Sequence, residues 1–181
     1  CLNTDERVYC ERAYLPWIDM IALMRTHDLP LASLETYTPV RDFDFVGITL
    51  PHELCATNVL EFLDLSGIPL HASERTEDDP LVFGGGPCAY NPEPFAPFFD
   101  AIFVGEGEEV DLEAVLRHRE LKGRGASRAQ ILRELSRIEG VYVPGLYDVE
   151  EHAIRDDHLA RGSRGYTTVT PRDADVPARV E

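Results

Sequence analysis

Two glycine-rich turns and one threonine carry the residue types best suited to holding a ligand. The candidate binding residues are Thr49, Gly84, Gly85, Gly86, Gly105, Glu106 and Gly107. Glycine has no side chain, so a glycine turn lets backbone N–H and C=O groups approach a bound molecule closely. The threonine hydroxyl and the glutamate carboxylate add hydrogen-bonding groups. The expected chemistry is binding, because no nucleophile–base pair and no paired carboxylates stand out in the sequence.

Each of these residues follows or ends a short apolar run that is typical of a buried parallel strand. The runs are residues 43–50, 81–83 and 101–104. Helical patterns come next: residues 53–65 form one predicted helix, with Leu54 among its inward-facing residues, and another begins after Gly107. Parallel strands joined by helices all end at the same edge of a sheet, which is where α/β proteins bind ligands. The two glycine turns and Thr49 are therefore expected to share one edge of the sheet.

The remaining patterns give the rest of the element order. Further strands are predicted at residues 8–14 and 68–72, a short strand or an extended segment at residues 31–34, and further helices at residues 16–27 and 128–138. Ser127 is expected to cap the helix that follows it. Residues 141–149 are expected to pair with the segment around residues 153–155.

Strands that alternate with helices predict an α/β fold with a doubly wound, mainly parallel sheet of the flavodoxin-like type. Counting from residues 8–14, the sequence predicts four main strands. A five-stranded sheet of this type needs one more. We expect that first strand upstream of Cys1, since the chain starts without Met. Residues 1–159 form the predicted domain, incomplete at its N-terminus, and residues 160–181 form a linker or strand-like tail.

Composition narrows the classes of protein further. The chain has 181 residues and a net charge of −16, which argues against a nucleic-acid surface, because such a surface needs clustered Lys and Arg. No apolar run is long enough for a membrane span, and no signal peptide is visible. The spacing of the four cysteines fits neither a zinc site nor an iron–sulfur cluster motif, and four are too few for a disulfide scaffold. A cytoplasmic location with reduced thiols is the expectation.

With these residues in view, the chain resembles a known family over roughly residues 8–149. The residues that carry the resemblance are Gly84-Gly85-Gly86-Pro87-Cys88-Ala89, Asn91-Pro92-Glu93-Pro94, and Phe99-Asp100-Ala101 leading to Gly105-Glu106-Gly107-Glu108-Glu109. The family is the N-terminal, cobalamin-binding-like domain of an uncharacterised group of radical SAM proteins. The resemblance implies that the first glycine turn lies along the nucleotide tail of cobalamin, and that Thr49 lies near the lower face of the corrin.

Two features of such proteins are absent from the sequence. None of the six histidines lies in an Asp-x-His-x-x-Gly motif, which supplies the lower ligand in cobalamin domains of the histidine-ligated type. The Cys-x-x-x-Cys-x-x-Cys motif for a [4Fe-4S] cluster is also missing. The cluster and SAM are therefore expected in a radical SAM domain beyond Glu181, which is the predicted partner. No cofactor is expected in these 181 residues alone, although the intact domain is a candidate for binding cobalamin.

The function predicted from the sequence is that of an accessory cofactor- or substrate-binding domain of a radical SAM enzyme. The alternative is a non-catalytic scaffold or protein-interaction domain that has lost its ligand. Each candidate residue also has a purely structural interpretation. The glycines suit tight turns, Thr49 suits a solvated strand end, and Glu106 suits the first turn of a helix.

Overall fold

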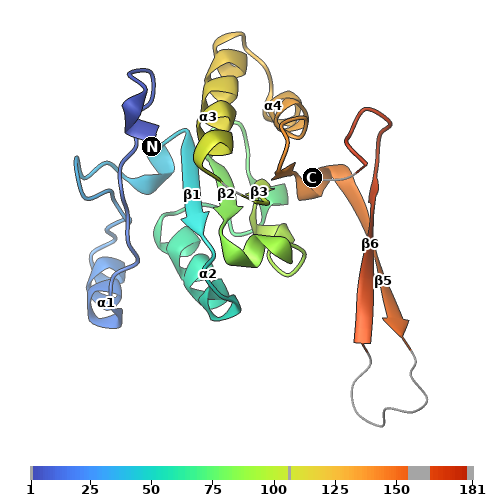
Figure 1. The fold of residues 1–181 in the computed structure, drawn as a ribbon. Helices are drawn as coiled ribbons and strands as arrows, with labels where there is room; N and C mark the ends of the chain where they lie inside the picture. Colours follow the sequence, from blue (N-terminus) through green and yellow to red (C-terminus); the bar gives the residue numbers. More distant parts are fainter. Residues whose placement is uncertain (1, 106, 155–163, 179–181) are drawn as a thin grey trace.

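The computed structural model describes residues 2–105, 107–154 and 164–178 (Figure 1). Its main sheet has four strands in the order β1-β2-β3-β4: β1 (Phe45–Thr49), β2 (Leu81–Gly85), β3 (Ala101–Phe103) and β4 (Val141–Tyr142). The first three strands are parallel, and β4 is antiparallel to β3. The predicted α/β fold with a mainly parallel, flavodoxin-like sheet is confirmed.

Helices cover both faces of this sheet (Figure 1). The α-helices are α1 (Ile18–Thr26), α2 (Ala56–Leu65), α3 (Gly107–Gly123) and α4 (Arg128–Leu135). Side chains of α2 share one hydrophobic cluster with Val82 and Ile102 of the sheet. Side chains of α3 and α4 share a second cluster with Phe83 and Phe103. Successive side chains of a strand point to opposite faces of the sheet, so each strand contributes side chains to both clusters.

A buried ion network fixes the amino ends of the central strands. The Asp100 carboxylate, just before β3, accepts hydrogen bonds from the Val82 backbone N–H at 2.8 Å and from the Arg75 guanidinium at 2.7 Å. Arg128, the first residue of α4, lies 2.8 Å from the other oxygen of the same carboxylate. The side chains of Arg75 and Asp100 are almost fully buried. One carboxylate thus joins β2, β3, α4 and the loop before β2.

A two-stranded antiparallel ribbon follows the main sheet. It consists of β5 (Tyr147–Ile154) and β6 (Arg164–Pro171) and projects from the body of the molecule (Figure 1). Its base is anchored, because the buried Tyr147 side chain donates a hydrogen bond to the Pro177 carbonyl. Strand β6 pairs with β5 across the predicted domain boundary at residue 160, and this boundary itself lies outside the described residues.

Several predicted strands are absent from the structure. Residues 8–14 are extended but form no strand, since the backbone N–H groups of Cys10 and Arg12 donate to the side chains of Asn3 and Glu35. Residues 31–34 contribute only an isolated bridge between Ala32 and Pro39, and residues 68–72 form no strand. The strands predicted at residues 8–14 and 68–72 were wrong because strand-like composition does not supply a neighbouring strand to pair with. For residues 31–34 the structure leaves the second alternative, an extended segment.

Two further predictions need correction. Residues 141–149 do not pair with residues 153–154; instead β4 pairs with β3, while residues 147–154 form one strand, β5. Residue 155 of that prediction lies outside the described residues. The helix predicted for residues 53–65 begins with a 3-10 turn (Glu53–Cys55), and this turn directs Leu54 outward with 85% of the residue exposed. No helix in the described ranges has both the length and the apolar character required to cross a membrane.

Candidate functional site

The structure brings most of the predicted site residues to one edge of the sheet. In the parallel pairing of β1 with β2, Thr49 is opposite Gly85, and in the pairing of β2 with β3, Gly84 is opposite Ile102. Gly105 follows β3 at the same carboxyl end. The geometric prediction that the two glycine turns and Thr49 share one edge is therefore confirmed. Whether these residues bind a ligand stays a prediction.

Packing within the chain itself explains two of the glycines. A Cβ atom on Gly84 would lie 3.1 Å from both the Leu50 and the Phe99 side chains, in the buried core. Gly86 has a φ angle of +104°, and a Cβ there would lie 3.2 Å from the Leu50 carbonyl oxygen. Such a positive φ favours glycine strongly. Gly84 thus lies in the core, whereas Gly86 and the neighbouring Thr49 are exposed at the edge.

Other positions at this edge have space around them. A Cβ on Gly105 would meet no heavy atom within 4 Å, and its φ angle of +111° by itself favours glycine at this position. Residues 51–54 are all exposed, and the 3-10 turn after β2 (Pro87–Tyr90) leaves Tyr90 74% exposed. Leu54 and Tyr90 therefore add an aliphatic and an aromatic side chain to an edge that also exposes Thr49, His52 and Glu53.

The second glycine turn is described only in part. Glu106 lies outside the described residues, and Gly107 is the first residue of α3. The carboxylate of Asp111, one turn into α3, lies beside Gly107, where a Cβ would be 3.3 Å from its Oδ1 atom. Burial raises the pKa of Asp111. Sequence reasoning missed this residue, because one acidic residue in an acidic helix carries no distinguishing signal.

Sequence reasoning also gave no role to His118 and Tyr142. His118 is buried in α3 against Phe45, with ring centroids 5.2 Å apart, and burial lowers its pKa. The Tyr142 hydroxyl donates to Glu93 Oε1 at 2.5 Å, and burial together with this hydrogen bond raises the pKa of Tyr142. This contact ties the loop that follows the first glycine turn to β4.

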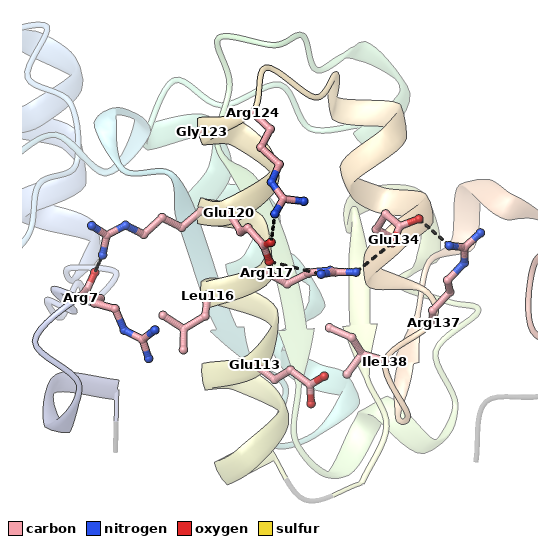
Figure 2. Close-up of a pocket in the computed structure, with 11 residues that line it drawn as sticks. Arg7, Glu113, Leu116, Arg117, Glu120, Gly123, Arg124, Glu134, Arg137 and Ile138 are labelled. Atoms are coloured by element: carbon pink, nitrogen blue, oxygen red, sulfur yellow. Dashed lines mark hydrogen bonds and ion pairs between the residues drawn. The ribbon is translucent and has the colours of Figure 1, made fainter.

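A separate depression of about 980 Å³ lies on the outer side of α3 and α4 (Figure 2). Five arginines line it: Arg7, Arg117, Arg119, Arg124 and Arg137. Four of the five form ion pairs, since Glu120 pairs with Arg117 and Arg124, Glu134 pairs with Arg117 and Arg137, and Asp5 pairs with Arg7. This arrangement is a surface ion-pair network, and its lining includes none of the residues predicted to bind a ligand.

The described cysteines do not form a site for an iron–sulfur cluster. Cys10 is exposed in the segment before α1, whereas Cys55 and Cys88 are buried. Across residues 2–105, 107–154 and 164–178, no three His, Cys, Asp or Glu side chains are grouped as metal ligands. A [4Fe-4S] cluster needs at least three thiolates, so these residues do not fit one. Burial raises the pKa of the Cys88 thiol, which disfavours the thiolate.

The fold defines the chain as an α/β domain with a mainly parallel sheet, and comparison with known families places it more narrowly. A family described as "Radical SAM proteins, N-terminal" matches residues 1–144. The chain belongs to this family. The match ends shortly before β5, so the ribbon lies outside it.

One curated relative is an uncharacterised protein of Methanocaldococcus jannaschii. It is 27% identical to the chain over 134 residues, which are 73% of this chain and 28% of that protein. The chain thus spans little more than a quarter of this relative's length. No solved structure matches the chain.

Proposed function

We propose that this chain is the accessory binding domain of a radical SAM protein. In this proposal the carboxyl edge of its sheet holds a cofactor or substrate beside the domain that cleaves SAM. The observation that carries the proposal is the convergence of β1, β2 and β3 on one edge, with Thr49 and Gly86 exposed there. Ligands of open α/β sheets bind at such an edge.

The exposed groups at the edge suit a ligand with a broad apolar face and polar substituents. Leu54 and Tyr90 offer apolar and aromatic contact, while Thr49 and the backbone around Gly85, Gly86 and Gly105 offer hydrogen bonds. Cobalamin has this character. These residues would bind and orient it, and the cofactor itself would supply the reactive metal centre. The [4Fe-4S] cluster and SAM belong to the radical SAM domain of the longer protein.

The test is binding of aquocobalamin to the full-length protein, followed by its visible absorption. Thr49→Trp places a bulky side chain at the exposed end of β1 and should weaken binding at least about tenfold, a loss of about 1.4 kcal/mol. Thr168→Trp, at an exposed position on β6, is the matched control and should bind as the unchanged protein does. Equal binding by both variants would contradict the proposed site.

The alternative function is a scaffold that has lost its ligand. The surroundings of Gly84 and Gly86 support it, because contacts within the chain explain both glycines without a ligand. The same titration separates the two functions, since a scaffold binds no cobalamin in the full-length protein. For the 181-residue chain alone we expect little affinity in either case. A half-built slot would leave much of the nucleotide tail in water, and each Å² of apolar surface left unburied forgoes roughly 25 cal/mol.

A further inference from the structure

Large apolar side chains that are exposed gather in the first part of the chain. They are Tyr9, Tyr14, Trp17, Ile18, Met20, Leu23, Leu29, Leu34 and Tyr37, which we call the N-terminal apolar surface. Among the other residues whose burial the structure describes (2–150 without 106, 108 and 109, and 168–178), only Leu54, Tyr90 and Val149 are large apolar residues of comparable exposure. Scattered exposed apolar residues are ordinary, but a concentration of this kind marks an interaction surface.

Helix α1 shows that this surface is covered on one side only. Ile21 and Met24 pack against the first hydrophobic cluster, and Arg25 forms ion pairs with Glu61 and Asp64 of α2. None of the nine residues of α1 is buried, and Ile18 alone is 71% exposed. A helix this short depends on packing for its stability. We therefore expect the exposed side of α1 to pack against another segment.

Strand β1 has an open edge on the same side of the molecule. Within the described residues β1 pairs with β2 alone, whereas β2 lies between two strands. Gly47, whose only atoms are backbone, is exposed, as is Thr49. Parallel strands are normally buried between neighbours, and an open apolar edge promotes pairing with another strand.

The extended segment of residues 8–14 lies beyond this edge. Figure 1 shows it, together with α1, on the β1 side of the sheet, away from β4. Its sequence predicts a strand, and one of its edges already has partners: the N–H groups of Cys10 and Arg12 donate to Asn3 and Glu35, and the Arg12 carbonyl accepts from the Leu34 N–H. One additional strand placed next to β1 would pair with the opposite edge of residues 8–14.

We propose that the free edge of β1 and the N-terminal apolar surface together form one docking surface for a further β-strand and the helix that follows it. Both come from a part of the same polypeptide outside residues 1–181. The helix covers the exposed side chains around Trp17 and Ile18, and the strand extends the parallel sheet beyond β1.

The length of the relative supports this occupant. The chain covers only 28% of the Methanocaldococcus jannaschii protein, and its family comprises the N-terminal parts of longer proteins. A slender strand also fits better than a second copy of the chain, because α1 and residues 8–14 flank the open edge (Figure 1). The loop after the added strand would lie beside Thr49, as a second wall of the candidate site. That last point alone rests on the proposed function.

Trp17 provides a direct test, since it is the only tryptophan in the 181 residues and is 77% exposed. Its emission is obtained in cofactor-free samples as the difference between each protein and its Trp17→Phe variant. In the 181-residue chain we expect long-wavelength emission that acrylamide quenches. In the full-length protein we expect emission at shorter wavelength and loss of quenching. Identical emission from the two proteins would overturn the proposal.

Hydrogen exchange tests the strand half of the docking surface. Amides of β1 and of residues 8–14 should exchange more slowly in the full-length protein than in the 181-residue chain. In the full-length protein, the double variant Ile18→Glu, Leu23→Glu should lose this protection. Val149→Glu, at an exposed apolar residue of β5, should keep it. Retention of protection in the double variant would contradict the role of the N-terminal apolar surface.

Light scattering distinguishes a second copy of the chain. If protection of Trp17 appears only in dimers and disappears on dilution to monomers, a second copy covers the surface and the proposal is overturned. If a monomeric full-length protein protects Trp17, the occupant comes from the same polypeptide. None of these measurements involves a cofactor, so failure here leaves the cobalamin test of the proposed function intact.

Discussion

Among individual residues, Asp100 has the largest expected effect on stability. Its carboxylate is shared by two guanidinium groups and the Val82 N–H, and the Nε atom of Arg128 is already buried without a partner among the described residues. Asp100→Asn removes the carboxylate that the guanidinium groups of Arg75 and Arg128 share, and so leaves both cations without their nearest counter-charge. We expect a loss of roughly 3–5 kcal/mol in the free energy of unfolding, measured by urea denaturation.

Asp64→Asn is the matched control for Asp100→Asn. Asp64 also pairs with an arginine, Arg25 at 2.6 Å, but both side chains are about half exposed. Exposed pairs contribute at most about 1 kcal/mol. Equal effects of the two substitutions would show that burial of the Asp100 network does not control its energy.

His118 makes stability depend on pH near neutrality. Burial lowers its pKa from the ordinary value of 6.5, so the unfolded chain takes up a proton at a higher pH than the folded chain. The contribution of the neutral, buried His118 side chain to the free energy of unfolding is fully present above pH 6.5. It is lost as the pH falls through the lowered pKa that His118 has in the folded chain. Urea denaturation should therefore show falling stability from pH 7.5 to pH 5.5.

His118→Leu should remove that part of the pH dependence, whatever its effect on stability at pH 7.5. The control is His27→Gln, a change at an exposed histidine just after α1, which should leave the pH profile unaltered. An unchanged profile in His118→Leu would assign the acid sensitivity to other groups.

At the scale of elements, the N-terminus of α4 carries a capping box. The Ser127 hydroxyl accepts from the Gln130 N–H, and the Gln130 side chain accepts from the Ser127 N–H. Ser127→Ala removes the first of these bonds and should cost about 1 kcal/mol. Thermal unfolding should show the loss, whereas Ser73→Ala, at an exposed position, should change stability by less than about 0.5 kcal/mol.

The elements that sequence reasoning predicted well are those with strong local signals. The Ser127 cap is confirmed, as are the strands at the runs before each glycine turn. Apolar runs that end at glycines leave few alternatives to a buried strand. The orientation of Leu54 was wrong because periodicity assumed a regular helix, whereas a 3-10 turn starts this one. A change of helix type shifts every side chain around the axis.

At the scale of the whole molecule, pairings between distant segments could not be predicted. Arg75 and Arg128 meet at Asp100 only because the sheet and α4 bring them together, and no spacing in the sequence encodes that contact. The same holds for β4, whose two residues pair with β3. The edge shared by the candidate residues was predictable, since it follows from parallel strands alone. Ligand identity does not follow from that geometry.

The ribbon gives a whole-molecule prediction, because it lies outside the family match yet its base contributes to the core. Tyr147 and Val176 are both buried in the first hydrophobic cluster, and Arg133 of α4 pairs with Asp173 and Asp175. Deleting residues 145–181 removes these contacts and exposes Tyr142. Each buried apolar side chain lost costs about 1.5–3 kcal/mol, so the midpoint of thermal unfolding should fall sharply.

A shortened ribbon is the matched control. Val149 and Val169 are opposite each other in the β5–β6 register, so an Asn-Gly turn can replace residues 150–168 and join them directly. This chain keeps Tyr147, Val176 and the ion pairs of Arg133, and should unfold close to the temperature of the unchanged chain. If the shortened ribbon destabilises the chain as much as the full deletion does, the distal ribbon, rather than its anchored base, supports the fold.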